Sequence, residues 1–175
     1  MRFLSMHSRS MMPYIAALLL AATIMIAGCT APSASSAQAS ASPVQSGGDD
    51  SRIIEIDSMT SVDAALVNGP VLIEFGAPWC AWCSQEKPVV AGLADEYPTV
   101  AFFEVNSDDS PGMVKDFYVK GIPQMEIIVR KNPDGSYQYI DAMGTSVTDR
   151  YKSRIVGYRT REELKPLIDA AVAVR

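Results

Sequence analysis

The chain has 175 residues, of which 48% are hydrophobic, and its formal net charge is −5 at pH 7. This length and composition suit a single domain with one buried core, and the acidic balance argues against binding to nucleic acid or to an anionic lipid surface. With three cysteines, and with its one histidine, His7, close to the start, the chain is not a disulfide-stapled scaffold and has no histidine for catalysis or metal binding in its body.

Residues 1–28 are predicted to be an export signal. Two arginines and the histidine precede an uncharged apolar run over residues 11–27, which ends in the sequence IAGC at Cys29. This ending resembles the lipobox of prokaryotic lipoproteins, and the resemblance implies that the leader is cleaved and Cys29 is lipidated. An uncleaved membrane anchor is the alternative, because about 17 apolar residues are at the lower limit of what spans a bilayer. Both interpretations tether the remaining chain to the extracytoplasmic face of the cell membrane.

Residues 29–51 are predicted to be the lipidated cysteine followed by a disordered linker. The segment after Cys29 consists almost wholly of Ala, Ser, Pro, Gln and Gly, so it lacks the large apolar side chains whose burial would offset the entropy of ordering. We expect a folded domain over residues 52–175.

Within residues 52–175 the pattern alternates between short strands and helices. The run VLIEF at residues 71–75 is apolar at nearly every position, as expected of a central strand covered on both faces. The predicted elements are, in chain order, a strand at 52–56, a helix at 58–67, a strand at 71–75, a helix at 80–97, a strand at 100–106, a helix at 111–118, a strand at 124–130, hairpin arms at 137–140 and 151–156, and a helix at 161–173.

Cys80 and Cys83 are three residues apart at the point where a strand gives way to a helix. At a helix N-terminus, the helix dipole and free backbone N–H groups favour the thiolate of Cys80, whereas Cys83, one turn further, is expected to be more buried and protonated. The asymmetry suits a reaction in which one thiolate attacks a disulfide and the other resolves the mixed disulfide. A purely structural disulfide and a zinc ion shared across a dimer are the alternatives, since one chain offers too few ligands for zinc.

Four motifs in order resemble the thioredoxin superfamily. They are VLIEFGAPWCAWC at residues 71–83, Pro88 inside the following helix, VNSD at 105–108 and KGIP at 120–123. The resemblance covers residues 53 to about 173 and implies an α/β thioredoxin fold, with a central mixed β-sheet flanked by helices and, here, an extended hairpin before the last helix. It also implies that Cys80 and Cys83 form a redox-active disulfide, with Cys80 as the attacking thiol and Cys83 as the resolving one.

Glu74 occupies the position where the resemblance implies a buried acid that acts, through water, as base for the resolving thiol. Burial raises the pKa of a carboxyl group, which suits it to accept a proton near neutral pH. A strand glutamate that reaches solvent is the alternative. Thioredoxins commonly have a lysine on the neighbouring strand where this chain has Glu104, so either one of the two carboxyl groups holds a proton or Glu104 points to water.

The resemblance also implies a substrate groove beside the cysteines. Trp79 is expected to form its apolar rim, with core packing as the alternative, and Pro123, in the cis form, to leave the backbone of Ile122 free to pair with an extended substrate. Trp82 departs from the family, which has Gly-Pro or Gly-His between the cysteines where this chain has Ala81-Trp82. Without an imidazole there we expect a reductant, and we treat Trp82 as a candidate substrate contact.

These observations together predict a membrane-tethered, extracytoplasmic thiol-disulfide oxidoreductase that reduces protein disulfides. The sequence contains no nicotinamide or flavin motif, so we expect no cofactor and electrons supplied by a membrane thiol carrier. Since one chain offers too few ligands, we also expect no metal. We further expect a monomer. The alternatives are a redox-inactive thioredoxin-like adaptor or chaperone, and a disulfide oxidant or isomerase.

Overall fold

The computed structural model describes residues 52–175, so the predicted leader, Cys29 and the linker up to residue 51 lie outside the described residues. Among residues 52–175, no helix is both long enough and apolar enough to cross a bilayer. The elements are, in chain order, β1 (Ile53–Glu55), α1 (Met59–Leu66), β2 (Val71–Gly76), α2 (Ala81–Glu96), β3 (Ala101–Asn106), α3 (Pro111–Asp116), β4 (Gln124–Lys131), β5 (Tyr137–Ile140), β6 (Ser146–Val147), α4 (Arg150–Ser153), β7 (Ile155–Val156) and α5 (Arg161–Ala173).

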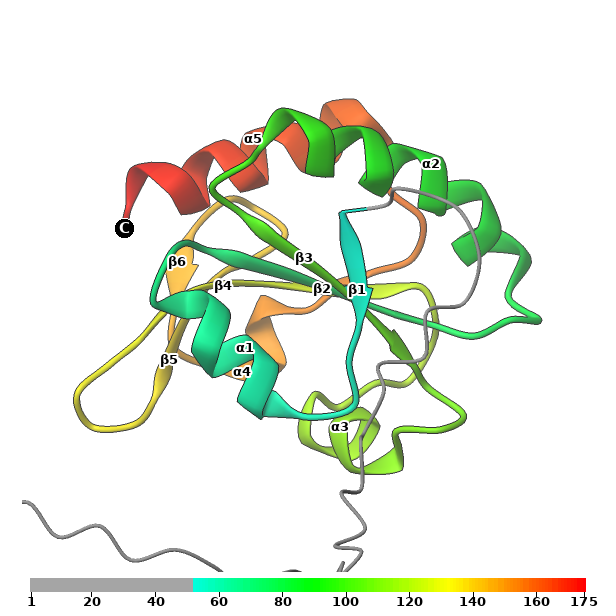
Figure 1. Ribbon diagram of the computed structural model, residues 1–175, viewed down its shortest axis with the longest axis horizontal. Helices are drawn as coiled ribbons and strands as arrows, with labels where there is room; N and C mark the ends of the chain where they lie inside the picture. Colours follow the sequence, from blue (N-terminus) through cyan, green and yellow to red (C-terminus); the bar gives the residue numbers. More distant parts are fainter. Residues whose placement is uncertain (1–51) are drawn as a thin grey trace, which may run out of the picture. The chain divides into compact units, whose positions relative to one another are not determined.

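These strands form one mixed sheet in the order β1-β3-β2-β4-β5-β6, with β7 paired to β4 (Figure 1). β1, β3 and β2 run parallel, and β4 is antiparallel to β2. β4 then pairs antiparallel with β5 along its later residues and with β7 at Gln124 and Met125. The mixed α/β sheet predicted from the sequence is therefore confirmed.

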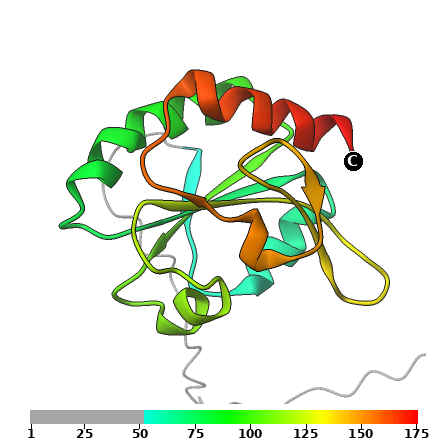
Figure 2. The same cartoon turned by 180° about the vertical axis from the view of Figure 1, so that it is seen from behind.

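The sheet has a hydrophobic core on each face. Helices α2 and α5 cover one face and α1, α3 and α4 lie on the other (Figure 1, Figure 2). β2 is buried at every position and contributes Leu72 to the first core and Ile73 to the second, because successive side chains of a strand point to opposite faces. The continuous apolar run in β2 reflects this burial on both sides.

The predicted hairpin arm at residues 151–156 is wrong. β5 instead pairs with the two-residue strand β6, and the chain then forms the short helix α4 before β7 pairs with β4. Asp149 starts α4 because its carboxylate accepts the Tyr151 N–H at 2.9 Å. The Arg150 guanidinium links the first turn of α4 to β5 by donating to the Tyr139 hydroxyl at 2.7 Å. The other expected elements are present with bounds within two residues of those predicted.

We predict that the turn between α1 and β2 tolerates only glycine at position 69. A Cβ atom added to Gly69 would lie 1.7 Å from the Thr99 carbonyl oxygen, whereas nothing lies within 4 Å of the corresponding position at Gly112 in α3. Gly69→Ala should lower the free energy of unfolding by about 1–3 kcal/mol in urea denaturation. Gly112→Ala, the control, should leave stability equal or higher because alanine favours a helix. Equal stability of Gly69→Ala and the unaltered protein would contradict this packing.

Candidate active site

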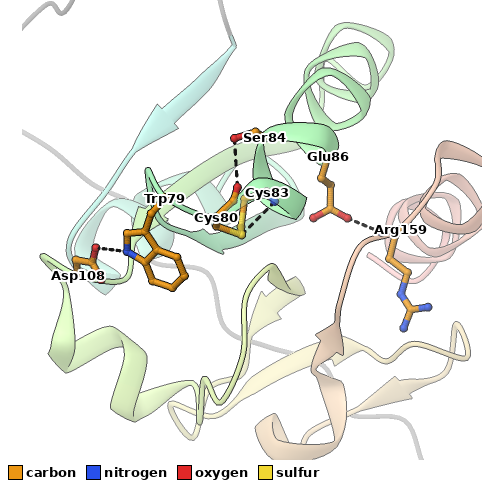
Figure 3. Close-up of a disulfide and its surroundings, with 7 residues drawn as sticks. All are labelled: Trp79, Cys80, Cys83, Ser84, Glu86, Asp108 and Arg159. Carbon is orange, nitrogen blue, oxygen red and sulfur yellow. Dashed lines mark hydrogen bonds between the residues drawn. A yellow bond between two sulfur atoms is a disulfide. The ribbon is translucent and has the colours of Figure 1, made fainter.

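Cys80 and Cys83 are joined by a disulfide at the junction of β2 and α2, with their Cα atoms 5.3 Å apart (Figure 3). In this oxidised form Cys80 is 5% exposed and Cys83 7% exposed. The expectation that Cys83 is the more buried of the two is therefore wrong for this state, because the bond draws both sulfur atoms into the same environment.

Cys80 is the N-cap residue of α2. Its Sγ accepts a hydrogen bond from the Cys83 backbone N–H at 3.1 Å, and its carbonyl oxygen accepts the first helical hydrogen bond, from Ser84 N, also at 3.1 Å. Once the disulfide is reduced, the same N–H group and the positive end of the helix dipole favour negative charge on the Cys80 sulfur.

The peptide bond between Ile122 and Pro123 is cis, as expected from the sequence. It lies at the start of β4, where Gln124 pairs with Phe75 of β2, and the Pro123 carbonyl accepts the Gly157 N–H at 2.8 Å. An apolar cleft of about 330 Å³ opens here, lined by Trp82, Ile122, Pro123, Gly157 and Tyr158.

The two tryptophans of the motif lie on the surface. Trp79 is 70% exposed, which excludes core packing, and its indole Nε1 donates to the Asp108 carboxylate at 2.8 Å (Figure 3). Trp82 is 58% exposed and packs against Tyr158 with ring centroids 5.9 Å apart. Asp108 therefore fixes the orientation of Trp79, while Trp82 forms a wall of the cleft beside the cis-proline.

Glu74 is buried, with 5% of its surface exposed. Burial is the main cause that raises its pKa to about 8, and the negative charges of Glu86 and Glu104 add to the effect. Glu74 and Cys83 line the same hollow of about 260 Å³, which has room for several water molecules. The hollow thus offers room for water beside both Glu74 and Cys83.

Glu104 resolves one of the alternatives left open by the sequence. It is the register neighbour of Glu74 in the parallel pair of β2 and β3, but its side chain is 37% exposed and forms an ion pair with Lys87 of α2 at 3.1 Å. Glu104 therefore reaches toward water. A lysine is present beside the buried acid after all, supplied by α2 instead of the neighbouring strand.

Two contacts at the site were not foreseen from the sequence. Glu86 of α2 is fully buried, and its Oε1 accepts the Arg159 backbone N–H at 2.6 Å (Figure 3), while its Oε2 has no hydrogen-bond partner among the described residues. Burial raises the pKa of Glu86 to about 7. Helical spacing could have found Glu86, because Cys83, Val90 and Leu93 lie on the same buried stripe of α2. No sequence pattern near Tyr158 or Trp82 predicts the contact between their rings.

This arrangement can carry out dithiol-disulfide chemistry. Cys80 lies at the N-terminus of α2. Cys83 and the buried Glu74 line one hollow with room for water, and Trp82, between the two cysteines, lines an apolar cleft. Among residues 52–175, no group of three or more histidine, cysteine, aspartate or glutamate side chains is placed to hold a metal ion. The fold and this site together define a thioredoxin-fold dithiol protein.

The chain belongs to the thioredoxin family, whose family model matches residues 55–149. Among curated relatives, the chloroplastic thioredoxin M-type of Brassica napus is 40% identical over 62 residues, which are 35% of this chain and 35% of that protein. A thioredoxin of Pyropia yezoensis is 38% identical over 61 residues, 34% of this chain and 57% of that protein. The chain thus spans about a third to somewhat over half of the length of these relatives.

Solved structures share the fold at lower identity. The oxidized form of mitochondrial thioredoxin 3 from Saccharomyces cerevisiae has a TM-score of 0.51 and 24% identity, covering 67% of this chain and 93% of that one. A mutant thioredoxin from Halobacterium salinarum NRC-1 has a TM-score of 0.52 and 23% identity, covering 72% of this chain and 96% of that one. The thioredoxin fold therefore extends over most of the described residues.

We predict that the stability of the oxidised protein reports the buried state of Glu74. Because its pKa is raised from 4.5 to about 8 on folding, the unfolded chain ionises first as the pH rises. The stability present below pH 4.5 is then lost progressively toward pH 8, by at most about 1.4 kcal/mol per pH unit. Glu74→Gln lacks this loss, so its free energy of unfolding relative to the unaltered protein should rise across that range.

Urea denaturation of both oxidised proteins at several pH values measures this difference. Asp95→Asn, at an exposed position on α2 outside this hollow, controls for the loss of one negative charge. A stability difference for Glu74→Gln that stays constant with pH would contradict a protonated Glu74 in the folded protein.

Proposed function

We propose that the protein is a thiol-disulfide oxidoreductase that reduces protein disulfides on the extracytoplasmic face of a membrane. The observation that carries the proposal is the Cys80–Cys83 disulfide at the N-terminus of α2, beside the apolar cleft at the cis Ile122–Pro123 bond. Membership of the thioredoxin family supports it. No cofactor is needed, because the two thiols themselves carry the two electrons.

In the proposed reaction the thiolate of Cys80 attacks one sulfur of the substrate disulfide. A mixed disulfide forms, and the other substrate sulfur leaves as a thiolate. Cys83 then loses its proton to Glu74 through water and attacks the Cys80 sulfur, which releases the second substrate thiol and forms the Cys80–Cys83 disulfide seen in the structure. The substrate gains two electrons and the cysteine pair loses two.

Substrate binding is assigned to Trp79, Trp82, Ile122 and Pro123. The exposed indole of Trp79 borders the disulfide, and Trp82 forms a wall of the apolar cleft that Ile122 and Pro123 also line. In this proposal the cis bond leaves the backbone of Ile122 free to pair with an extended substrate chain.

The protein acts as a lipid-anchored monomer in this proposal. The apolar leader and the IAGC sequence ending at Cys29 support lipidation, and the polar segment from residue 30 to 51 supplies the tether. Since the chain carries no nicotinamide or flavin motif, a membrane-embedded thiol carrier returns the electrons that each turnover consumes.

Cysteine variants test the chemistry directly. We predict that Cys83→Ser, given a disulfide-containing peptide, accumulates a mixed disulfide through Cys80 that is visible by mass spectrometry, because no second thiol resolves it. Cys80→Ser should form no such adduct and should lose at least about 99% of the reductase rate. Adducts of equal yield from both variants would contradict the assigned roles, and partner binding that is insensitive to Cys80→Ser and occurs without any adduct would favour the adaptor alternative.

A cysteine variant also tests the anchor. We predict that the unaltered protein, expressed in a bacterium, incorporates labelled palmitate and partitions into the detergent phase on phase separation. Cys29→Ser should not incorporate the label and should not partition into the detergent phase. The Cys80→Ser variant is the matched control and should incorporate the label normally. Equal labelling of Cys29→Ser and the unaltered protein would exclude lipidation at Cys29.

A further inference from the structure

Basic residues are concentrated beside the cleft of an otherwise acidic chain. The chain contains 15 basic and 20 acidic residues. The two segments that flank the cis-proline, residues 111–123 and 149–159, reverse this balance, with only Asp116 and Asp149 as acids against six bases, Lys115, Lys120, Arg150, Lys152, Arg154 and Arg159. Such an asymmetry creates a local positive potential that the net charge of the chain conceals.

Four of these cations have no acidic partner within the described residues. Lys152 and Arg159 form ion pairs with Asp149 and Glu163, whereas no ion pair among residues 52–175 involves Lys115, Lys120, Arg150 or Arg154.

The one buried acid beneath Arg150 and Arg154 does not cancel their charge. Glu126 is fully buried, and its Oε2 lies 2.6 Å from the Ser153 hydroxyl, which also lies 2.9 Å from the Arg150 carbonyl oxygen. One hydroxyl proton serves one acceptor, so both contacts are satisfied when Glu126 is protonated and donates to Ser153. Burial, which raises the pKa of Glu126 to about 8, agrees with this geometry.

Two exposed tyrosines accompany the four cations. Tyr118 and Tyr151 are 49% and 56% exposed, and their rings meet edge to face with centroids 5.6 Å apart. Arg154 stacks 3.7 Å above the Tyr151 ring and donates to the Tyr118 carbonyl at 3.1 Å. Tyr118 has a φ of 52°, in a backbone region that residues other than glycine rarely adopt. The contact from Arg154, which follows α4, thus supports a constrained turn that keeps the Tyr118 ring at the surface.

These six residues, Lys115, Tyr118, Lys120, Arg150, Tyr151 and Arg154, form what we term the basic aromatic face. It lies where Arg150 of α4 donates to the Asp116 carbonyl of α3 at 3.2 Å and Arg154 donates to the Tyr118 carbonyl. It borders a surface hollow of about 580 Å³ that Lys115, Tyr118, Lys120 and Arg150 help to line together with Asp116.

The two segments that carry the basic aromatic face also lead to the cleft beside the cis-proline. Lys120 lines the hollow, and Ile122, two residues further, lines the cleft. On the second segment the chain runs from Arg154 through β7 to Gly157 and Tyr158 of the cleft, and the hydrogen bond from Gly157 N to the Pro123 carbonyl holds the two segments together at 2.8 Å. The cleft and the face are thus built on the same two segments, so one partner polypeptide can contact both.

We propose that the basic aromatic face binds an acidic segment of the partner protein whose disulfide reacts with Cys80 and Cys83. The inference rests on the proposed function and deepens it, because it names the substrate class as disulfides flanked by aspartate or glutamate. Long-range attraction accelerates encounter with such partners, and the two tyrosines add apolar contact area with polar tips at little entropic cost.

An anionic lipid surface is the other partner that a basic face attracts, but the site disfavours it. A membrane seated on this face would cover the adjoining cleft and the disulfide, which a protein substrate must reach. The hollow and the paired rings also suit a chain of side chains better than a flat layer of headgroups.

The test uses the reduced full chain and two peptides that share one central disulfide and differ only in flanks of Asp/Glu or of Lys/Arg. The acidic peptide should be reduced about tenfold faster at low ionic strength, and the preference should shrink in about 0.5 M salt. Lys115→Gln/Lys120→Gln should lose most of the preference. The control Arg52→Gln/Lys165→Gln, which removes two positive charges elsewhere, should keep it.

Equal reduction of the two peptides, or a preference unchanged in Lys115→Gln/Lys120→Gln, overturns the inference while leaving the proposed function intact. A second readout needs no exchange chemistry: peptides with serine in place of cysteine are titrated and amide shifts around Tyr118 and Lys120 are followed by NMR. Selective binding of the acidic peptide without any reduction would support the face and contradict the proposed function. A third outcome is that the protein binds phosphatidylglycerol vesicles better than phosphatidylcholine vesicles, loses this difference in Lys115→Gln/Lys120→Gln, and shows no preference between the peptides. That result would assign the face to lipid and overturn the proposal.

Discussion

The antiparallel pairing of β2 with β4 is the constraint on which the site depends. Its register places Phe75 opposite Gln124, so the residues that follow β2, which lead into Cys80, meet the residues that precede β4, which include the cis Ile122–Pro123 bond. Because β2 is buried at every position, this register is difficult to shift: a slip of one residue would exchange the side chains of the two cores. The disulfide and its cleft are thus brought together by the most buried part of the sheet.

The second organising feature is a set of carboxyl groups that folding removes from water. Glu74, Glu86 and Glu126 are each less than a tenth exposed, and burial is the main cause of the raised pKa of all three. Their burial opposes stability near neutral pH, yet each has a position with a consequence. Glu74 shares a hollow with Cys83, and the Glu86 carboxyl group binds the segment that carries Tyr158 to α2. Glu126 contacts Ser153, which lies between Arg150 and Arg154 in the chain. The domain therefore gives up some stability for groups that can hold protons beside its redox centre and beneath its basic aromatic face.

The sequence predicted the parts of the site that short motifs encode and failed where distant contacts decide. A short stretch of sequence is enough to predict the cysteine pair, the cis bond before Pro123 and the central strand around Glu74. Each of these depends on residue type and spacing within a few positions. Residues 151–156 were misassigned because the pattern of apolar residues there is compatible with a strand, whereas Arg150 reaches Tyr139 of a different element and favours a helical turn. The ion pair of Glu104 with Lys87 likewise joins two elements whose packing no local pattern specifies.

The redox titration of Cys80 and Cys83 tests the central claim most directly. The full chain would be equilibrated with thiol-disulfide buffers of known potential. The state of the pair would be followed by the fluorescence of Trp79 and Trp82, each of which immediately precedes one of the two cysteines. A disulfide reductant without an imidazole between its cysteines should titrate reversibly as a two-electron couple near about −270 mV. A midpoint near about −120 mV would contradict the reductant assignment in favour of an oxidant, and a pair that never titrates would contradict the redox function itself.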